Sequence, residues 1–180
     1  MAATYTTLVQ TIAWAAGKNM LAQVNHTGSG KIMDVYRIWM IGRETTAVAG
    51  SSCLIELWQC SSVASYTGGA AQTFVKHDTL SAAAPATVIA NAGTTTVLTK
   101  NSLIKRYLRY SEEILLTNLY PQTLMSNYLP LNVLQDSGYG DTNIQPLRFR
   151  EGEGFVLFTP ASGGGTYVGS TDIIVEFALV

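Results

Sequence analysis

Apolar and polar residues alternate with a period of two wherever a clear period can be found along this chain. In residues 172–180, the side chains of Ile173, Val175, Phe177 and Leu179 fall on one face, and the opposite face mixes acidic with apolar residues. Such alternation is typical of a half-buried strand. It predicts that this segment lies inside a sheet.

Other β-rich runs are separated by turn-forming residues. They are residues 31–41, 53–60, 73–76, 87–90, 94–99 and 154–159. The Gly-rich connection after residue 159 predicts a hairpin or a long loop between the last two strands. Residues 103–110 and 112–118 fit either a helix or a strand, and the β-rich neighbourhood together with Pro121 favours strands.

The strand pattern predicts an all-β fold. At least eight short strands with turns between them, and no strong amphipathic helix, point to a sandwich, a jelly roll or a barrel. A length of 180 residues favours one domain. Residues 1–20 are rich in Thr and Ala and weakly patterned, which predicts an N-terminal arm or an edge strand preceding a β domain at residues 21–180.

The amino-acid composition limits which functions the protein could have. The chain has 11 Lys and Arg against 12 Asp and Glu, a net charge of −1, with 13% charged and 47% apolar residues. Disorder requires low hydrophobicity and high net charge, and duplex nucleic-acid binding requires clustered cations, so both are excluded. A charge-poor surface has little self-repulsion, which indicates a protein that packs against others.

The cysteine spacing indicates a protein made in a reducing cytosol. Cys53 and Cys60 lie on one predicted strand, about 23 Å apart, whereas a disulfide needs Cα atoms within about 7 Å. We therefore predict two unpaired thiols. The N-terminus lacks a signal-peptide pattern, and the sequence has no apolar run long enough for a membrane span, so we expect a soluble protein.

Three groups of polar residues have side chains that could form a chemical site. His77 and Asp78 are adjacent, but neighbours on a strand point to opposite faces and so cannot form a catalytic pair. His26 has no second His or Cys at ligand spacing, which argues against zinc. Two carboxylates in residues 136–141 flank glycines and could offer oxygens to Ca²⁺, although the loop does not match an EF-hand and ordinary turns use the same residues.

Two further patterns have simpler structural explanations. Glu151 and Glu153 are two apart, as a glycosidase pair could be, but the Glu-Gly-Glu-Gly sequence is typical of a tight turn. Residues 105–110 alternate cations with aromatics, a pattern that suits single-stranded nucleic acid or a subunit contact. We therefore expect no catalytic, cofactor-binding or metal-binding residues and no enzyme activity.

Several segments resemble small β-rich head proteins of tailed bacteriophages. Residues 57–62, 68–79 and 82–88 are similar to the middle of such proteins, where a run of the form GG…VKHD…AAPA links two strands. Residues 145–157, which read QPLRFREGEGFVL, resemble their P-L-x-L-R-x-G-E-G hairpin, and residues 174–177 resemble their final strand. The likeness covers about the last two-thirds of the chain, and it transfers no catalytic residue.

The resemblance implies a single jelly-roll-like β-sandwich of about eight or more short antiparallel strands with an extended N-terminal arm. It also implies a structural virion protein without a cofactor, a decoration or cement protein that stabilises the capsid from its exterior. Such a protein would be made in the host cytoplasm and would bind the major capsid protein. It would form a homo-oligomer, with a trimer favoured, and would contact neither nucleic acid nor membrane directly.

An alternative is a jelly-roll binding module of a phage tail or baseplate that recognises host glycan. Sugar rings stack on exposed aromatic side chains, and the candidates are Trp14, Trp39, Trp58, Tyr139 and Tyr167. Trp39 and Trp58 lie in the two clearest predicted strands, so we expect both of them in the core.

Overall fold

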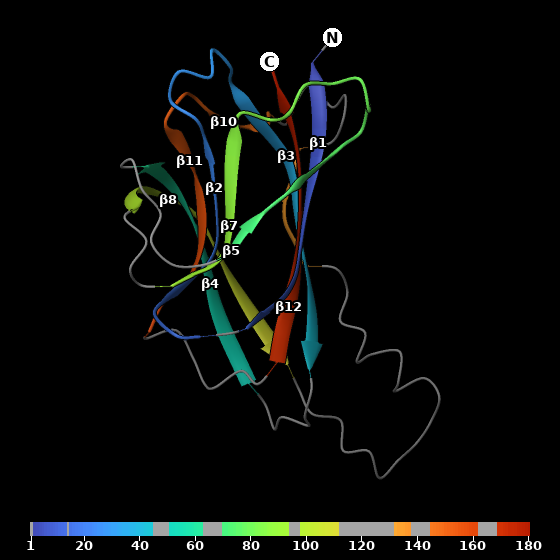
Figure 1. The fold of residues 1–180 in the computed structure, drawn as a ribbon. Helices are drawn as coiled ribbons and strands as arrows, with labels where there is room; N and C mark the ends of the chain where they lie inside the picture. Colours follow the sequence, from blue (N-terminus) through green and yellow to red (C-terminus); the bar gives the residue numbers. More distant parts are fainter. Residues whose placement is uncertain are drawn as a thin grey trace.

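A computed structural model describes residues 2–13, 15–44, 51–62, 70–93, 98–111, 132–137, 145–161 and 169–180. These residues form twelve strands and no helix (Figure 1). The first six are β1 (Ala3–Ala13), β2 (Lys18–Asn25), β3 (Met33–Glu44), β4 (Ser51–Ser62), β5 (Ala70–Gln72) and β6 (Phe74–Lys76). The others are β7 (Ala86–Gly93), β8 (Leu98–Ser111), β9 (Asn132–Asp136), β10 (Leu147–Phe149), β11 (Glu153–Thr159) and β12 (Gly169–Leu179).

The strands form two antiparallel sheets that pack face to face. Sheet A has the order β10-β3-β12-β1-β6, with β9 also paired to β3. Sheet B has the order β5-β7-β2-β11-β4-β8. The final strand β12 lies between β3 and β1, so the expectation that residues 172–180 lie inside a sheet is confirmed.

The connectivity defines a jelly roll. Strands of the first half of the chain pair in reverse order with strands of the second half: β1 with β12, β2 with β11, β3 with β9 and β10, and β4 with β8. Successive pairs fall in opposite sheets, as when one long antiparallel ribbon is rolled into a sandwich. The predicted all-β sandwich is confirmed, although several strands are longer than expected.

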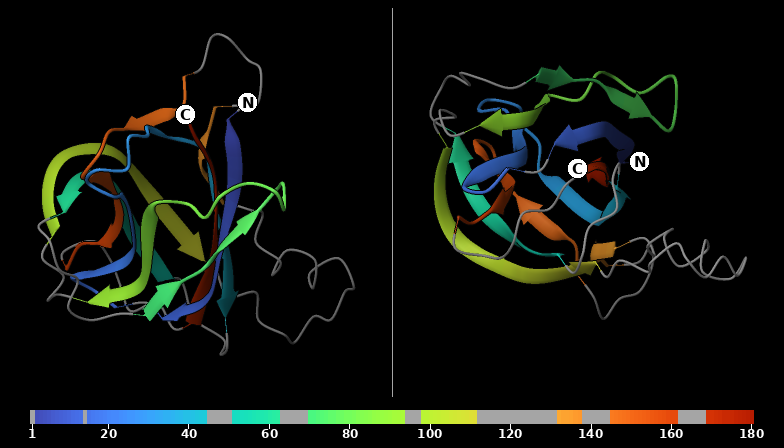
Figure 2. Two further views of the ribbon diagram at one scale, coloured as in Figure 1. Left: turned by 45° about the horizontal axis from the view of Figure 1, so that its top comes forward. Right: turned by 90° about the horizontal axis from the view of Figure 1, so that it is seen from below.

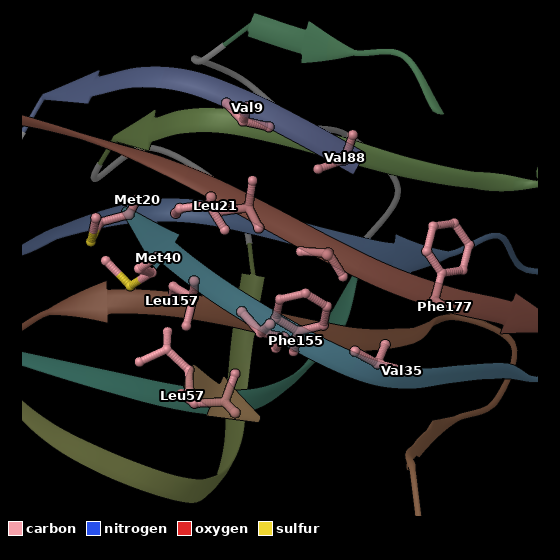
Figure 3. Close-up of a cluster of buried hydrophobic side chains, with 14 of the residues drawn as sticks. Val9, Met20, Leu21, Val35, Met40, Leu57, Val88, Phe155, Leu157 and Phe177 are labelled. Atoms are coloured by element: carbon pink, nitrogen blue, oxygen red, sulfur yellow. The ribbon is translucent and has the colours of Figure 1, made fainter. Parts of the chain in front are cut away.

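Side chains that point inward from both sheets form one continuous core (Figure 3). Residues Ile173, Val175, Phe177 and Leu179 are all buried in it, as their alternation predicts. The Phe177 ring stacks on Tyr5 at a centroid separation of 5.3 Å, and Phe74 meets the same ring edge-on. Aromatic pairs of this kind add about 0.5–1.5 kcal/mol beyond their area burial.

The N-terminal residues form a sheet strand. Along β1, residues from Ala3 to Ala13 pair with β12, while β6 covers only Tyr5 to Thr7 on the opposite side. Residues 2–13 therefore lie within sheet A, where β1 has β12 on one side and the short edge strand β6 on the other. The backbone hydrogen bonds of a central strand hold this segment in the sheet.

A bulge interrupts the outer part of β1. The register with β12 shifts between Val9 and Ile12, and Thr11 adopts a left-handed φ of 57°. The Thr11 N–H donates a hydrogen bond to the carboxylate of Asp172 at 2.9 Å, which stabilises this unusual conformation. Bulges of this kind hinder a further strand from pairing at a sheet edge.

Residues 70–93, which we call the strap, connect the two sheets. Within the strap, β5 and β7 extend sheet B, whereas β6 extends sheet A. The connection from β6 to β7 crosses the end of the sandwich where both chain termini lie (Figure 1). At the opposite edge of sheet B, β8 curves strongly around the molecule (Figure 2), in keeping with two register shifts against β4.

Two connections that could have been hairpins join the two sheets instead. β11 belongs to sheet B and β12 to sheet A, so the chain crosses between the sheets after Thr159, and of the two predicted alternatives the hairpin is wrong and the longer connection fits. Likewise, β10 and β11 lie in different sheets, so residues 145–157 form a corner between the sheets and not the paired hairpin that the resemblance implied. The predicted strand at residues 112–118 lies outside the described residues.

A tight turn forms the corner between β10 and β11. The Glu153 N–H donates to the Arg150 carbonyl at 3.0 Å, and Gly152 has a φ of +73° at the third position. These features define a type II turn, which requires glycine there. Two residues later, Gly154 lies so close to β2 that an added Cβ would be 2.0 Å from the Gln23 carbonyl oxygen.

We predict that Gly154→Ala destabilises the fold severely. The new methyl group would meet backbone atoms of a central strand, so β2 and β11 must separate, at a cost of about 3 kcal/mol or more. The variant should show a melting temperature lower by about 6 °C or more. Gly28→Ala is the matched control, since Gly28 has a φ of +78° but open space around it, and should cost only about 1 kcal/mol. Equal melting temperatures for the two variants would contradict the close approach.

Candidate functional site

Both histidines lie where the strap joins the rest of the sandwich. The Nε2 atom of His77 is 2.6 Å from the hydroxyl of Thr6 on β1, and its backbone N–H donates to the Thr4 carbonyl. The Nε2 atom of His26, just after β2, is 2.5 Å from the hydroxyl of Thr87 on β7. Each imidazole therefore connects one sheet of the sandwich to the strap.

Asp78 has a separate structural role. Its carboxylate accepts a hydrogen bond from the Leu80 N–H at 2.9 Å, and its carbonyl accepts one from the Ser81 N–H at 3.0 Å. This is the Asx-turn arrangement that aspartate commonly makes with its own backbone. His77 and Asp78 thus have different partners, and the structure shows no catalytic hydrogen bond between them.

Asp136 binds a guanidinium group. The Nε atom of Arg37 donates to Asp136 at 3.1 Å, and the same guanidinium lies 3.5 Å from the carboxylate of Glu176. Residues 138–141, the rest of the proposed cation loop, lie outside the described residues. In the part of the chain that is described, no group of three or more His, Cys, Asp or Glu side chains could hold a metal ion.

The Glu-Gly-Glu-Gly segment forms the tight turn that the sequence predicts, and both of its carboxylates bind backbone. Glu151 accepts hydrogen bonds from the N–H groups of Gly28 and Gly30, at 2.9 and 2.5 Å, in the loop between β2 and β3. Glu153 accepts one from the Arg150 N–H at 2.9 Å. The two glutamates therefore fix the corner of the fold.

The cationic residues of β8 also make contacts within the fold. The Lys105 ammonium donates to Gln135 of β9 at 2.9 Å, which ties the edge of sheet B to sheet A. Arg106 pairs with the buried carboxylate of Glu56 at 2.8 Å. Burial lowers the pKa of Lys100, whose ammonium lies over the ring of Phe158, while nearby Glu56 opposes that shift. The contacts of Lys105 and Arg106 give the first part of the 105–110 segment a structural role.

Neither described tryptophan lies between the sheets, so the expectation of core positions is wrong. Trp39 alternates with the core residues Ile38 and Met40, and it therefore lies half-buried on the outer face of sheet A. The Arg37 guanidinium is 5.5 Å from the centre of its ring. Trp58 lies on the outer face of sheet B, where its indole N–H donates to Glu56 at 2.8 Å. Trp14, Tyr139 and Tyr167 lie outside the described residues.

A small apolar cluster covers part of the outer face of sheet B. Its buried members alternate with core residues along β2, β4 and β11, and they are Ala22, Val24, Cys60 and Val156. Trp58 and Leu98 pack against them. Burial raises the pKa of the Cys60 thiol to about 12, and Cys60 forms no disulfide. The unpaired thiol predicted for Cys60 is therefore confirmed.

A buried carboxylate on the outer face of sheet A is paired by an arginine. Asp34 of β3 is almost fully buried, and Arg148 of β10 donates two parallel hydrogen bonds to it, each at 2.8 Å. The hydrogen bonds and charge of Asp34 raise the pKa of Arg148. A bidentate pair of this kind is among the stronger side-chain contacts and fixes orientation. It fastens the short strand β10 to β3 of sheet A.

Large apolar side chains on the strap and on the neighbouring strand β1 are unusually exposed to solvent. Leu80, at the tip of the turn after β6, is 93% exposed, and Val75 on β6 is 60% exposed. Leu8 on β1 is 45% exposed. The alternation of polar and apolar residues did not predict this surface. Leu80 is nevertheless the one large apolar residue in residues 77–87, where its neighbours are small or polar. These exposed side chains make the strap the candidate interaction surface.

Comparisons with known proteins identify no relative of this chain. No family model, no curated protein sequence and no solved structure matches this chain. Among the described residues, no helix is long and apolar enough to span a membrane.

We predict that Cys60 is unreactive in the folded protein. A pKa of about 12, against an ordinary value near 8.5, lowers the thiolate fraction at pH 8 about a thousandfold. A Cys53→Ser variant leaves Cys60 as the single thiol, and a chromogenic disulfide reagent should label it only after unfolding in guanidinium. Because the folded-state pKa is raised, this thiol favours the folded state below about pH 9, and that contribution declines as the pH rises from 9 towards 12. Labelling of the native variant at the rate of an unfolded control would contradict this burial.

Proposed function

We propose that this protein is a structural component of a bacteriophage particle, a decoration or cement protein that binds and stabilises the capsid. The observation that carries the proposal is where the phage-like segments fall in the fold. The described part of the GG…VKHD…AAPA region, residues 70–88, lies in the strap, and the QPLRFREGEGFVL region forms the corner between β10 and β11. The resemblance thus runs through two of the connections that join the sheets.

The polar groups support a function exerted through surfaces. Carboxylates that could serve in chemistry are instead bound by arginines or by backbone N–H groups, as described above for Asp34, Glu56, Asp78, Glu151 and Asp172. Their hydrogen-bonding capacity is used within the fold. A near-neutral net charge of −1 also suits dense packing of many copies, since repulsion between neighbours is small.

The proposed partner is the major capsid protein, on the exterior of the particle. A repeating lattice presents the same contact many times, so an oligomer that engages several lattice points binds tightly even where each contact is weak. We therefore propose a homo-oligomer with cyclic symmetry, with a trimer favoured, made in the host cytoplasm before it joins the particle.

The glycan-binding alternative has less support. A sugar-stacking platform needs an aromatic ring with a free face, and the Trp39 ring carries the Arg37 guanidinium. The Trp58 ring packs against the apolar cluster of sheet B, and its indole N–H is bound to Glu56. Both rings therefore already have partners within the chain.

We predict that the protein is found on heads of the phage or induced prophage that encodes it. Particles from a deletion strain should lack the protein and release DNA at a lower temperature than wild-type particles. Purified protein added back should restore heat resistance and appear as symmetric density on the capsid by cryo-electron microscopy. Intact wild-type heads without this density would refute the proposal. Strong hits for the purified oligomer on a glycan array would instead favour the alternative.

A further inference from the structure

The edges of the two sheets differ greatly in length. At three of them the strands are short: β5, β6 and β10 have three residues each, and β9 has five. At the fourth, the edge strand β8 of sheet B has 14 residues. Among the described residues β8 pairs with β4 alone, and it runs along the outside of the molecule (Figure 2). A short edge strand resists pairing with another chain, whereas a long one offers a row of free N–H and C=O groups.

The second half of β8 has the regular pairing that strand addition requires. In the first half, the register against β4 shifts twice, and the extra residues on β8 are Asn101 and Ile104. From Lys105 to Ser111, by contrast, every residue has a partner on β4. In such a stretch, every second residue directs its N–H and C=O away from the partner strand. These groups lie at the free side of the sheet.

The same segment is positively charged in a chain whose charges otherwise nearly balance. β8 contains four of the 11 cations of the sequence and no acid: Lys100, Lys105, Arg106 and Arg109. Arg106 pairs with Glu56, yet its side chain is still 60% exposed. The Lys105 ammonium binds the neutral amide of Gln135. Positive charge therefore exceeds negative charge along residues 105–111, which we call the basic edge.

Two other occupants fit the basic edge less well. Single-stranded nucleic acid stacks its bases on exposed aromatic rings. Tyr107, which lies among the cations, instead packs against the core, and burial raises its pKa to about 12. A second copy that paired through its own β8 would bring cations against cations, and like charges on facing strands destabilise a sheet.

We propose that the basic edge binds an extended acidic segment of another protein, which adds to sheet B as a further strand. Hydrogen bonds to the free N–H and C=O groups supply the affinity, and Asp or Glu side chains opposite the cations supply the selectivity. The inference rests on the length and charge of this edge, so it is independent of the virion assignment.

The test follows the backbone amide signals of the isotope-labelled full-length protein by NMR. In the free protein, alternate amides of residues 105–111 should exchange quickly with solvent. A synthetic peptide in which Glu and Val alternate should shift these signals at millimolar concentration and slow the exchange of the same amides. The peptide with Gln in place of Glu should bind at least about fivefold more weakly. The acidic peptide with alternate N-methylated amides lacks the donors for strand addition and should give no protection.

Two double variants with the same net charge provide the matched comparison. Lys105→Gln with Arg109→Gln removes two cations from the basic edge, whereas Lys31→Gln with Lys76→Gln removes two that lie outside β8. We expect the first variant to bind the acidic peptide about fivefold more weakly than wild type and the second to bind as wild type does. Equal weakening in both variants would make the effect one of net charge and would overturn the inference.

Other results would also decide against it. Slow exchange of every amide from Lys105 to Ser111 in the free protein would mean that this edge is already covered. Equal binding of the N-methylated peptide would show an electrostatic contact without an added strand. If the acidic peptide shifts no signal of β8, the cations serve only to keep the edge unpaired. None of these outcomes bears on the virion assignment, which the deletion strain tests separately.

Discussion

The pairing of β2 with β11 is the interaction on which the rest of the fold depends. These strands lie at the centre of sheet B, and they join residues more than a hundred positions apart in the sequence. Gly154 allows the two backbones to approach where any side chain would collide with Gln23. The pairs β1 with β12 and β4 with β8 belong to the same antiparallel ribbon, so the register of β2 with β11 also constrains theirs. Such distant pairings close large loops, so folding is expected to be slow relative to helical proteins of this size.

Sequence patterns predict a strand well where its two faces have different environments. β12 alternates because only its inner face is fully buried, and β3 and β4 are found for similar reasons, with boundaries wrong by a few residues. β2 was missed because residues 19–25 are buried on both faces, so no alternation appears. It also carries Gln23 inside the core, where the amide interacts with the Thr7 hydroxyl and the Met33 sulfur.

The candidate surface was harder to predict than the fold. Tryptophan is usually assigned to the interior, yet Trp39 and Trp58 lie on outer faces, because β3 and β4 place Ile38 and Leu57 inward at the neighbouring positions.

Which sheet a strand joins is also not encoded locally. The turn between β10 and β11 is read correctly from its glycines, whereas the crossing from one sheet to the other depends on contacts such as Asp34 with Arg148. Exposure of Leu80 follows from the tertiary position of its loop.

The two ends of the described chain lie side by side. Ala3 pairs with Leu179 across β1 and β12, and the backbone of Val180 exchanges two hydrogen bonds with that of Ile32. A polypeptide fused to either end would therefore emerge at the same pole of the sandwich, next to the strap. This geometry also means that a short linker could join the ends and allow the chain to be opened elsewhere as a circular permutant.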